Sequence, residues 1–186
     1  MSKFTITRMI TVLTIAILAG GLLAGCASKP VYSINCGADE VYVDKSGKTW
    51  LADQEKTDKL AWGVIGGETV LRDIVEIPGT QAPMVYLNEA YSMAGYVFDL
   101  APGKYTVRLH FAETFEGVAL AGDRVFDIAF NGKTVLKDFD VFKEASGAFK
   151  PVIKEFKGVE VKDKLAIDFT TNIQNPEING IEILAE

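Results

Sequence analysis

The chain is poor in histidine and cysteine, the two side chains on which much nucleophilic and metal chemistry depends. It contains one histidine, His110, and two cysteines, Cys26 and Cys36, in 186 residues. A single histidine is a weak basis for a Ser-His-Asp triad, and Cys36 with His110 does not make up a zinc-ligand set. The sequence also lacks a Gly-x-Ser-x-Gly elbow and a glycine-rich loop that opens a helix. We therefore expect no triad, no phosphate-binding loop, no cofactor and no metal.

The single histidine lies three residues before Glu113, a spacing that invites comparison with an acid–base pair. Residues Tyr105–Ala112 alternate apolar with polar side chains, which is typical of a half-buried β-strand. Neighbouring side chains of a strand point to opposite faces, so His110 falls on the polar face with Arg108, and Glu113 on the apolar face with Phe111. We expect a surface or sheet-face histidine, a glutamate at a rim, and no shared reacting atom.

The first 25 residues have the pattern of a secretory signal. Lys3 and Arg8 precede an apolar run over Met9–Leu23, which ends in the small residues before Cys26. The alternative is a membrane-spanning helix, but threonines and glycines interrupt the run, and spanning needs about 20 mainly apolar residues. We therefore predict that residues 1–25 are removed.

The sequence Leu23-Ala24-Gly25-Cys26 resembles the bacterial lipoprotein processing box. That resemblance implies that Cys26 becomes the first residue and carries acyl chains such as palmitate, since stable anchoring takes more than one chain. Residues 26–30 would then form a short tether at the membrane. Ala27 after the cysteine favours an outer-membrane or cell-surface address in the cell envelope.

The net charge and the second cysteine, Cys36, exclude further classes of binding partner and bond. Loss of Lys3 and Arg8 would leave 17 basic residues against 25 acidic ones and move the formal net charge from −6 to −8. An acidic surface argues against nucleic acid and against electrostatic binding to anionic lipid. Cys36 would remain without a partner for an internal disulfide, and we expect it to be a small buried hydrophobe.

The remaining chain, residues 31–186, reads as one all-β domain. Asn131-Gly132 is a strong hairpin signal, and a second hairpin is predicted between Val159–Val161 and Leu165–Phe169. Only Asp53–Leu60 is expected to hold a helical turn or two. Many short strands separated by close turn signals predict a β-sandwich or jelly roll. The other expected strands are Gly95–Leu100, Tyr105–Glu113, Arg124–Phe130, Thr134–Leu136 and Asn179–Ala185.

Aromatic residues in irregular stretches are the most informative remaining feature. Trp50, Trp62, Tyr86, Tyr91 and Phe115 all lie near glycine, amide or acidic residues. Aromatic faces with a few placed polar groups can hold an amphipathic ligand such as a sugar ring, whose one face is lined with C–H groups. Any one of these aromatics also has the simpler interpretation of a core residue, so composition leaves the function open.

Several stretches, taken in order, resemble the malectin family of carbohydrate-binding domains. They are Ile34-Asn35-Cys36-Gly37, Val85–Ser92, Gly103–Glu113, Arg124–Ile128 with Asn131-Gly132, Lys137–Val141, and Asn175-Pro176 with Ile181-Glu182-Ile183. Together they cover nearly all of residues 31–186. The resemblance implies a β-sandwich in which loops at one end form an aromatic cleft that binds glucose-containing oligosaccharides without cleaving them.

The same resemblance implies the residues of the cleft. By position, Trp62, Tyr91 and Phe115 would supply aromatic stacking. Polar orientation would come from Gln174, Asn175 and Glu113. Thr114 occupies a position at which family members can have an aromatic residue, and Gln174 occupies one at which they can have an acidic residue. These two differences leave the identity of the sugar undetermined.

Two other classes of function stay open. The protein is alternatively a structural or protein-binding envelope lipoprotein with a vestigial cleft, which would not gather the aromatics around one opening. A glycosidase would need two facing carboxylates about 5–9.5 Å apart in the cleft. A chain with 25 acidic residues always contains candidate pairs, so the sequence does not decide this point.

Overall fold

The computed structural model describes residues 29–73 and 76–186. The predicted signal segment, Cys26 and residues 26–28 of the tether lie outside these ranges. Lys29 and Pro30, placed in the tether by the sequence interpretation, belong to the first strand, where Lys29 pairs with Ala185. Within the described ranges, no helix combines the length and the apolar character needed to cross a membrane.

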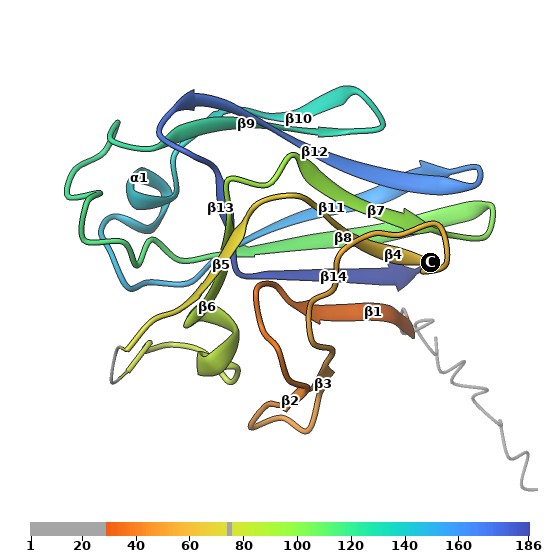
Figure 1. The fold of residues 1–186 in the computed structure, drawn as a ribbon, viewed down its shortest axis with the longest axis horizontal. Helices are drawn as coiled ribbons and strands as arrows, with labels where there is room; N and C mark the ends of the chain where they lie inside the picture. The colour runs from red at the N-terminus through yellow and green to blue at the C-terminus, as the bar shows by residue number, and fades with distance from the viewer. Residues whose placement is uncertain (1–28, 74–75) are drawn as a thin grey trace, which may run out of the picture.

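Two antiparallel sheets form the body of the protein (Figure 1), which confirms the predicted all-β sandwich. The first sheet has the order β1 (Lys29–Asn35), β14 (Gly180–Ala185), β8 (Gly103–Phe111) and β11 (Val152–Val161). The second has the order β10 (Lys133–Phe139), β9 (Val125–Phe130), β12 (Lys164–Ile173), β7 (Gly95–Asp99) and β4 (Trp62–Ile65).

Shorter elements sit around one end and one face of this sandwich. A small sheet joins β13 (Glu177–Ile178), β6 (Asn88–Tyr91) and β5 (Glu68–Leu71), and a separate pair joins β2 (Tyr42–Val43) to β3 (Thr49–Trp50). The helical elements are a 3-10 turn, η1 (Pro83–Tyr86), and one short helix, α1 (Val141–Ala145). The small sheet matters most here because β13 contacts β8 and pairs with β6, and Glu89 of β6 accepts a hydrogen bond from Thr114, just after the end of β8.

The turn at Asn131-Gly132 confirms the hairpin prediction. Both residues have positive φ, 48° and 77°, and Phe130 pairs directly with Lys133 across the turn. Two central residues of positive φ are the requirement of the type I′ turn, whose twist matches that of the strands it joins. The predicted hairpin between β9 and β10 therefore forms for the expected reason.

The second predicted hairpin is wrong. β11 pairs with β8 in the first sheet, whereas β12 pairs with β7 and β9 in the second. The two residues between β11 and β12 thus carry the chain from one sheet to the other. A short polar turn between two apolar runs is compatible with either arrangement, because each run only needs one face toward the core. The helical turn expected within Asp53–Leu60 is also absent.

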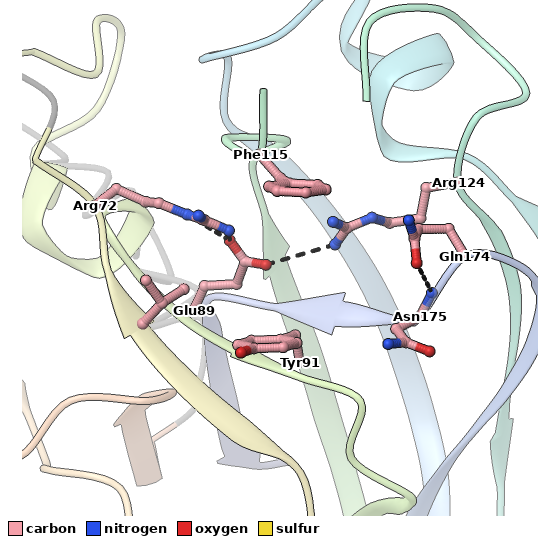
Figure 2. A pocket seen from close by; sticks show the side chains of 8 residues that line it. Arg72, Glu89, Tyr91, Phe115, Arg124, Gln174 and Asn175 are labelled. Carbon is pink, nitrogen blue, oxygen red and sulfur yellow. Dashed lines mark hydrogen bonds and ion pairs between the residues drawn. The ribbon is translucent and has the colours of Figure 1, made fainter. Parts of the chain in front are cut away.

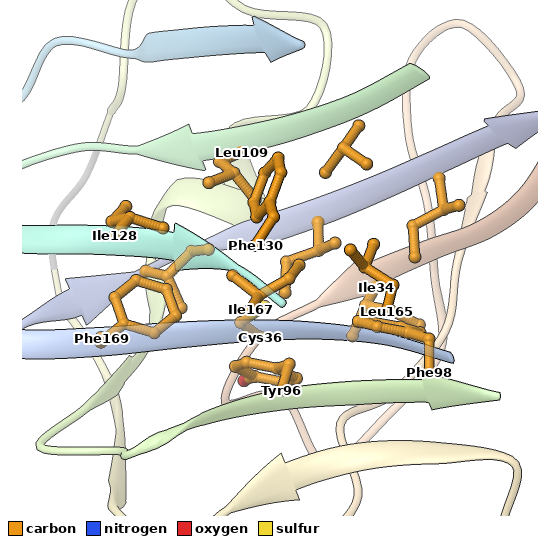
Figure 3. Close-up of a cluster of buried hydrophobic side chains, with 14 of the residues drawn as sticks. Ile34, Cys36, Tyr96, Phe98, Leu109, Ile128, Phe130, Leu165, Ile167 and Phe169 are labelled. Atoms are coloured by element: carbon orange, nitrogen blue, oxygen red, sulfur yellow. The ribbon is translucent and has the colours of Figure 1, made fainter. Parts of the chain in front are cut away.

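The core lies between the two sheets (Figure 3). Side chains from β1, β8 and β14 meet those from β7, β9 and β12; Ile34, Leu109, Phe98, Ile128 and Ile167 are fully buried examples. Cys36 is also fully buried, and burial raises the pKa of its thiol well above the ordinary value. The prediction that Cys36 is a small buried hydrophobe is confirmed.

The outer face of β8 is covered, and this corrects part of the expectation for His110. β3 and η1 place Trp50 and Tyr86 over that face, where they form a second small core. His110 is only 4% exposed. Its Nδ1 accepts a hydrogen bond from the Tyr86 hydroxyl at 2.8 Å, and its ring packs edge-on against Trp50. It is thus a sheet-face histidine, but a buried one, because alternation in one strand does not reveal what packs over its polar face.

Candidate functional site

A cavity of about 270 Å³ opens where several elements end beside the small sheet (Figure 2). Strands β5 and β6 supply one wall, the loop after β8 and the residue before β9 supply another, and the turn after β12 closes the rim. The lining residues are Val70, Arg72, Glu89, Tyr91, Phe115, Arg124, Gln174 and Asn175. Residues far apart in the sequence therefore converge on one opening.

Two aromatic side chains frame this cavity. Tyr91 ends β6, where its backbone pairs with Glu68 on one side and Glu177 on the other. Phe115 is 38% exposed, so part of its ring is open to solvent. In Figure 2 the two rings lie on either side of the ion pair between Glu89 and Arg124. The cavity therefore offers apolar faces at its sides and charge at its floor.

Phe115 packs against two guanidinium groups. Its ring centroid lies 5.5 Å from Cζ of Arg72 and 6.0 Å from Cζ of Arg124. Cations over an aromatic face within about 6 Å are attracted by the negative face of the ring. These contacts orient the phenyl ring from below and leave part of it open to the cavity.

Glu89 connects the two arginines. Arg72 donates from Nε and Nη2 to Oε2 of Glu89 at 3.1 and 2.8 Å, and the Thr114 hydroxyl donates to the same oxygen at 3.1 Å. The other carboxylate oxygen, Oε1, lies 3.5 Å from Nη1 of Arg124. A buried carboxylate is tolerated when it is paired and hydrogen-bonded in this way.

Glu113 lies beneath the cavity floor and is 1% exposed. Its Oε2 is 3.2 Å from Nε of Arg124, and its Oε1 accepts the backbone N–H of Phe115 at 3.0 Å. Burial raises the pKa of Glu113 to about 7, although the positive charge of Arg124 opposes that rise. The group therefore changes protonation near neutral pH.

A third buried carboxyl group, Glu177, completes what we call the cleft cluster: Arg72, Glu89, Glu113, Arg124 and Glu177. Glu177 lies in β13 and is fully buried, and neither of its carboxyl oxygens has a hydrogen-bond partner among the described residues. Burial, and after it the nearby charge of Glu89, raise its pKa well above the ordinary value, which favours its neutral form. The cluster then carries two cations against Glu89 and a titrating Glu113.

The rim on the β12 side consists of amides. Gln174 and Asn175 follow β12 and are exposed, and Gln174 adopts a left-handed φ of 58°. Its Oε1 accepts the backbone N–H of Asn175 at 3.0 Å, which leaves its amide N–H groups directed elsewhere. These two side chains add neutral donors and acceptors to the opening.

The structure brings together six of the seven residues expected at the site. Tyr91, Phe115, Gln174 and Asn175 line the cavity, and Glu113 and Thr114 lie directly beneath it. Trp62 does not: it lies in β4 within the main core, 7% exposed, with its ring stacked on Phe98 at 6.0 Å. The prediction that Trp62 lies in the cleft was wrong. A tryptophan followed by a glycine is as compatible with a core position as with a cleft position, so the local sequence did not distinguish the two.

Three charged residues of the cavity, Arg72, Glu89 and Arg124, were missed in the sequence. For two of them, the alternation of side chains along a strand could have indicated that they point inward. Arg124 is two residues before the inward Phe126, and Glu89 is two residues before Tyr91, so each shares a strand face with a residue known to point inward. A buried arginine near a buried glutamate could have been expected from that pattern.

Comparison with known proteins decides the family. The family model described as Malectin domain matches residues 30–181. The chain is a member of the malectin domain family. A probable LRR receptor-like serine/threonine-protein kinase of Arabidopsis thaliana is 33% identical in an alignment of 161 residues that covers 72% of this chain. This chain spans only 16% of the length of that kinase.

Solved structures share the malectin fold described above. A Bacteroides uniformis β-glucuronidase superposes with a TM-score of 0.75 and 28% identity, over 83% of this chain and 18% of the enzyme. The plant receptor FER, in its complex with the peptide RALF23 and LLG2, gives a TM-score of 0.72 and 22% identity, over 84% of this chain and 48% of that one. The resemblance stated from the sequence is thereby confirmed.

Proposed function

We propose that this malectin-domain protein is a non-catalytic carbohydrate-binding module, and that the cavity between Tyr91 and Phe115 is its ligand site. The observation that carries the proposal is the placement of two partly exposed aromatic rings at one opening with amides at its rim and charge at its floor. Sugar rings need an apolar face for their C–H groups and polar partners for their hydroxyls. The cavity provides both.

A binding role fits the carboxyl groups of the cavity better than a glycosidase does. Canonical glycoside hydrolysis needs two carboxyl groups that both face the scissile bond. Among the described residues only Glu89 contributes a carboxyl group to the lining, and Arg72 and Thr114 already occupy one of its oxygens. His110 hydrogen-bonds Tyr86 and Glu182 on the outer face of β8, so it serves no acid–base role here. The fold similarity to a β-glucuronidase concerns 18% of that enzyme.

A glycan array probed with the chain from Ala27 onward tests the binding role directly. We expect binding to a subset of glucose-containing oligosaccharides, with dissociation constants of about 1 μM to 1 mM. A parallel assay for reducing sugar should show no turnover. An array without any bound glycan would contradict the proposal, as would reducing sugar whose release disappears in Glu113→Gln.

A second proposal concerns the membrane. We propose that Cys26 carries the lipid of a cell-envelope lipoprotein, and the strand register supports a suitable orientation. Lys29 pairs with Ala185, which pairs with Tyr105 near the start of β8, whereas Glu113 and Phe115 follow the end of β8. Nine residues of strand span roughly 30 Å. An anchor at Cys26 would therefore hold the cleft at the end of the sandwich far from the membrane.

Replacement of the cysteine tests this anchor. Cys26→Ala should abolish acylation and move the protein from the membrane fraction into the soluble fraction. Ser28→Ala, two residues away, is a control that should leave both properties unchanged. If the wild-type protein enters the soluble fraction as readily as Cys26→Ala, the anchor is excluded.

A further inference from the structure

Arg124 is a buried guanidinium group that lacks hydrogen bonds within the described residues. It immediately precedes β9, is 4% exposed and lines the cavity. Its Nε and Nη1 are buried without a hydrogen-bond partner, although Oε2 of Glu113 lies 3.2 Å from Nε and Oε1 of Glu89 lies 3.5 Å from Nη1. Burying a charged donor without well-formed hydrogen bonds is costly. Because Nε and Nη1 face these buried carboxylates, a ligand in the cavity would reach the guanidinium group at Nη2.

The charge balance around Arg124 leaves room for an anion. Arg72 and Arg124 contribute two guanidinium groups, and the carboxylate of Glu89, which pairs with Arg72, offsets one of them. Glu177 is fully buried near them and burial favours its neutral form, whereas burial raises the pKa of Glu113 to about 7. With Glu113 protonated, the cluster carries one uncompensated positive charge at the floor of the cavity.

The walls of the cavity would protect a charged contact with Arg124. The Phe115 ring covers both guanidinium groups from one side, and Tyr91 lines the other side of the opening. Gln174 and Asn175 at the rim are neutral amides, so the rim does not repel an anion. Water exclusion by aromatic walls strengthens an ion pair, and a hydrogen bond from a guanidinium group to a carboxylate is stronger than one to a neutral hydroxyl.

We propose that the cleft selects carbohydrates that carry a carboxylate, that is, uronic acid residues, and that Arg124 binds this carboxylate. The inference rests on the proposed carbohydrate-binding function and names the chemical class of its ligand. The sugar ring lies against Tyr91 and the exposed part of Phe115, while its carboxylate reaches the guanidinium group that Glu113 releases on protonation. Gln174 and Asn175 contact the remaining hydroxyls.

Matched pairs of ligands test the proposal on the wild-type protein. Cellobiouronic acid is compared with cellobiose, and digalacturonic acid with its carboxyl-reduced form, by calorimetry at pH 6 and low salt. In at least one pair the acid should bind about tenfold more tightly than its neutral counterpart, because charge-assisted hydrogen bonds are stronger than neutral ones. Equal affinities within both pairs, or binding of the neutral sugars alone, would overturn the acidic-ligand proposal while the binding function stands. Absence of binding to these sugars and to every glycan on the array would overturn both.

Variants assign the effect to Arg124. Arg124→Gln should reduce the preference for the acid to about twofold or less. Arg108→Gln, which removes an equal charge from the outer face of β8, should leave the preference unchanged. Glu113→Gln retains Arg124 and removes its nearest carboxylate, so it should tighten acid binding severalfold at pH 8. This variant keeps the test decisive if Arg124→Gln does not fold.

The pH dependence gives a further independent readout. The groups that face Glu113 are Arg124, Glu89, Arg72 and Glu177, and burial raises the pKa of Glu113 itself to about 7. Acid binding should therefore strengthen severalfold between pH 8 and pH 6 in the wild type and remain flat in Glu113→Gln. The uronic carboxylate stays ionised in this range, since carboxylic acids titrate near about pH 4. A flat profile in the wild type, or a preference retained in Arg124→Gln, would contradict the role of Arg124.

Discussion

Two buried polar clusters lie near the end of β8, and they are built in opposite ways. The His110 cluster, which consists of Lys48, Tyr86, His110 and Glu182, is closed by hydrogen bonds. Tyr86 donates to Nδ1 of His110 at 2.8 Å, His110 Nε2–H donates to Glu182 at 3.0 Å, and Lys48 reaches the second oxygen of Glu182 at 2.8 Å. The cleft cluster contains buried oxygens and nitrogens without such partners.

This difference separates a structural network from a binding site. A fully satisfied buried network stabilises one arrangement, whereas groups left unsatisfied in a cavity are available to a ligand at a cost to stability. In the His110 cluster, burial would raise the pKa of Glu182, but hydrogen bonds from His110 and Lys48 lower it to about 2. In the cleft cluster, burial raises the pKa of Glu113 to about 7. The same substitution should therefore have opposite effects in the two places.

The largest effect is expected for Glu182→Gln. A pKa of about 2 instead of the ordinary 4.5 corresponds to roughly 3 kcal/mol of stability at neutral pH. The carboxylate is the favoured form in the fold, so this contribution is present above about pH 4.5 and is lost as the pH falls toward 2. Urea denaturation at pH 7 and pH 3 should show a large loss in the variant at pH 7 and a smaller one at pH 3.

A matched control for this prediction is Glu155→Gln on β11, on the other side of β8 in the same sheet. Glu155 likewise has a cationic partner, Arg108, but both side chains are partly exposed to solvent, where ion pairs contribute little. Its replacement should change stability only slightly. Equal stability of Glu182→Gln and the wild type at pH 7 would remove the contrast between the clusters.

The second effect has the opposite sign. Glu113→Gln should stabilise the protein at pH 8 by roughly 1–3 kcal/mol, because the wild type must bury an ionised carboxyl group whose pKa is about 7 rather than 4.5. The native wild type gains its proton as the pH falls through 7, so its disadvantage should shrink and vanish near pH 4.5. Thermal unfolding of both proteins at pH 8, 6.5 and 5 measures the gap. A variant less stable than the wild type at pH 8 would refute the account of a strained carboxylate.

The third effect concerns binding rather than stability. Tyr91→Ala and Phe115→Ala should each weaken carbohydrate binding by roughly 1–2 kcal/mol, about five- to thirtyfold, since each removes an aromatic wall of the cavity. Trp62→Phe is the control for an aromatic outside the cavity and should leave affinity unchanged. Calorimetry with circular dichroism as the folding check distinguishes these outcomes. Unchanged binding in both cleft variants would move the site elsewhere.

The smallest effect is expected at the rim. Gln174→Asp supplies a charged acceptor, so binding of neutral glucose-type ligands should tighten by roughly 1 kcal/mol, about fivefold. The same charge should weaken uronic acid binding through like-charge repulsion. Gln174→Asn is the neutral control of matched length. If both classes of ligand respond to Gln174→Asp in the same direction, the rim does not set selectivity.

Much of the fold followed from patterns in single strands. Alternation located β7, β8, β9 and β14, and the Asn131-Gly132 turn fixed its hairpin, because both signals depend on residues close in sequence. The passage of the chain from the first sheet to the second between β11 and β12 could not be predicted, because a two-residue turn does not indicate which strand the next one pairs with.

The site was predictable to a similar extent. Tyr91, Phe115, Gln174 and Asn175 came from the family resemblance, which compares loop positions directly. Burial of His110 and the ion pairs of Arg124 depend on segments that pack from elsewhere in the chain, and no local pattern states which segment that is. The prediction for Trp62 failed for the same reason, because the sequence does not show whether its side chain points into the core or into the cleft.

A single NMR titration tests the contrast between the two clusters most directly. The ¹⁵N-labelled protein is titrated with cellobiouronic acid and, separately, with cellobiose, while amide signals and the imidazole signals of the only histidine are followed. We expect saturable shifts at Tyr91, Phe115, Gln174 and Asn175, with the His110 signals unmoved. Shifts centred on His110 and Trp50, with an unperturbed cleft, would contradict it.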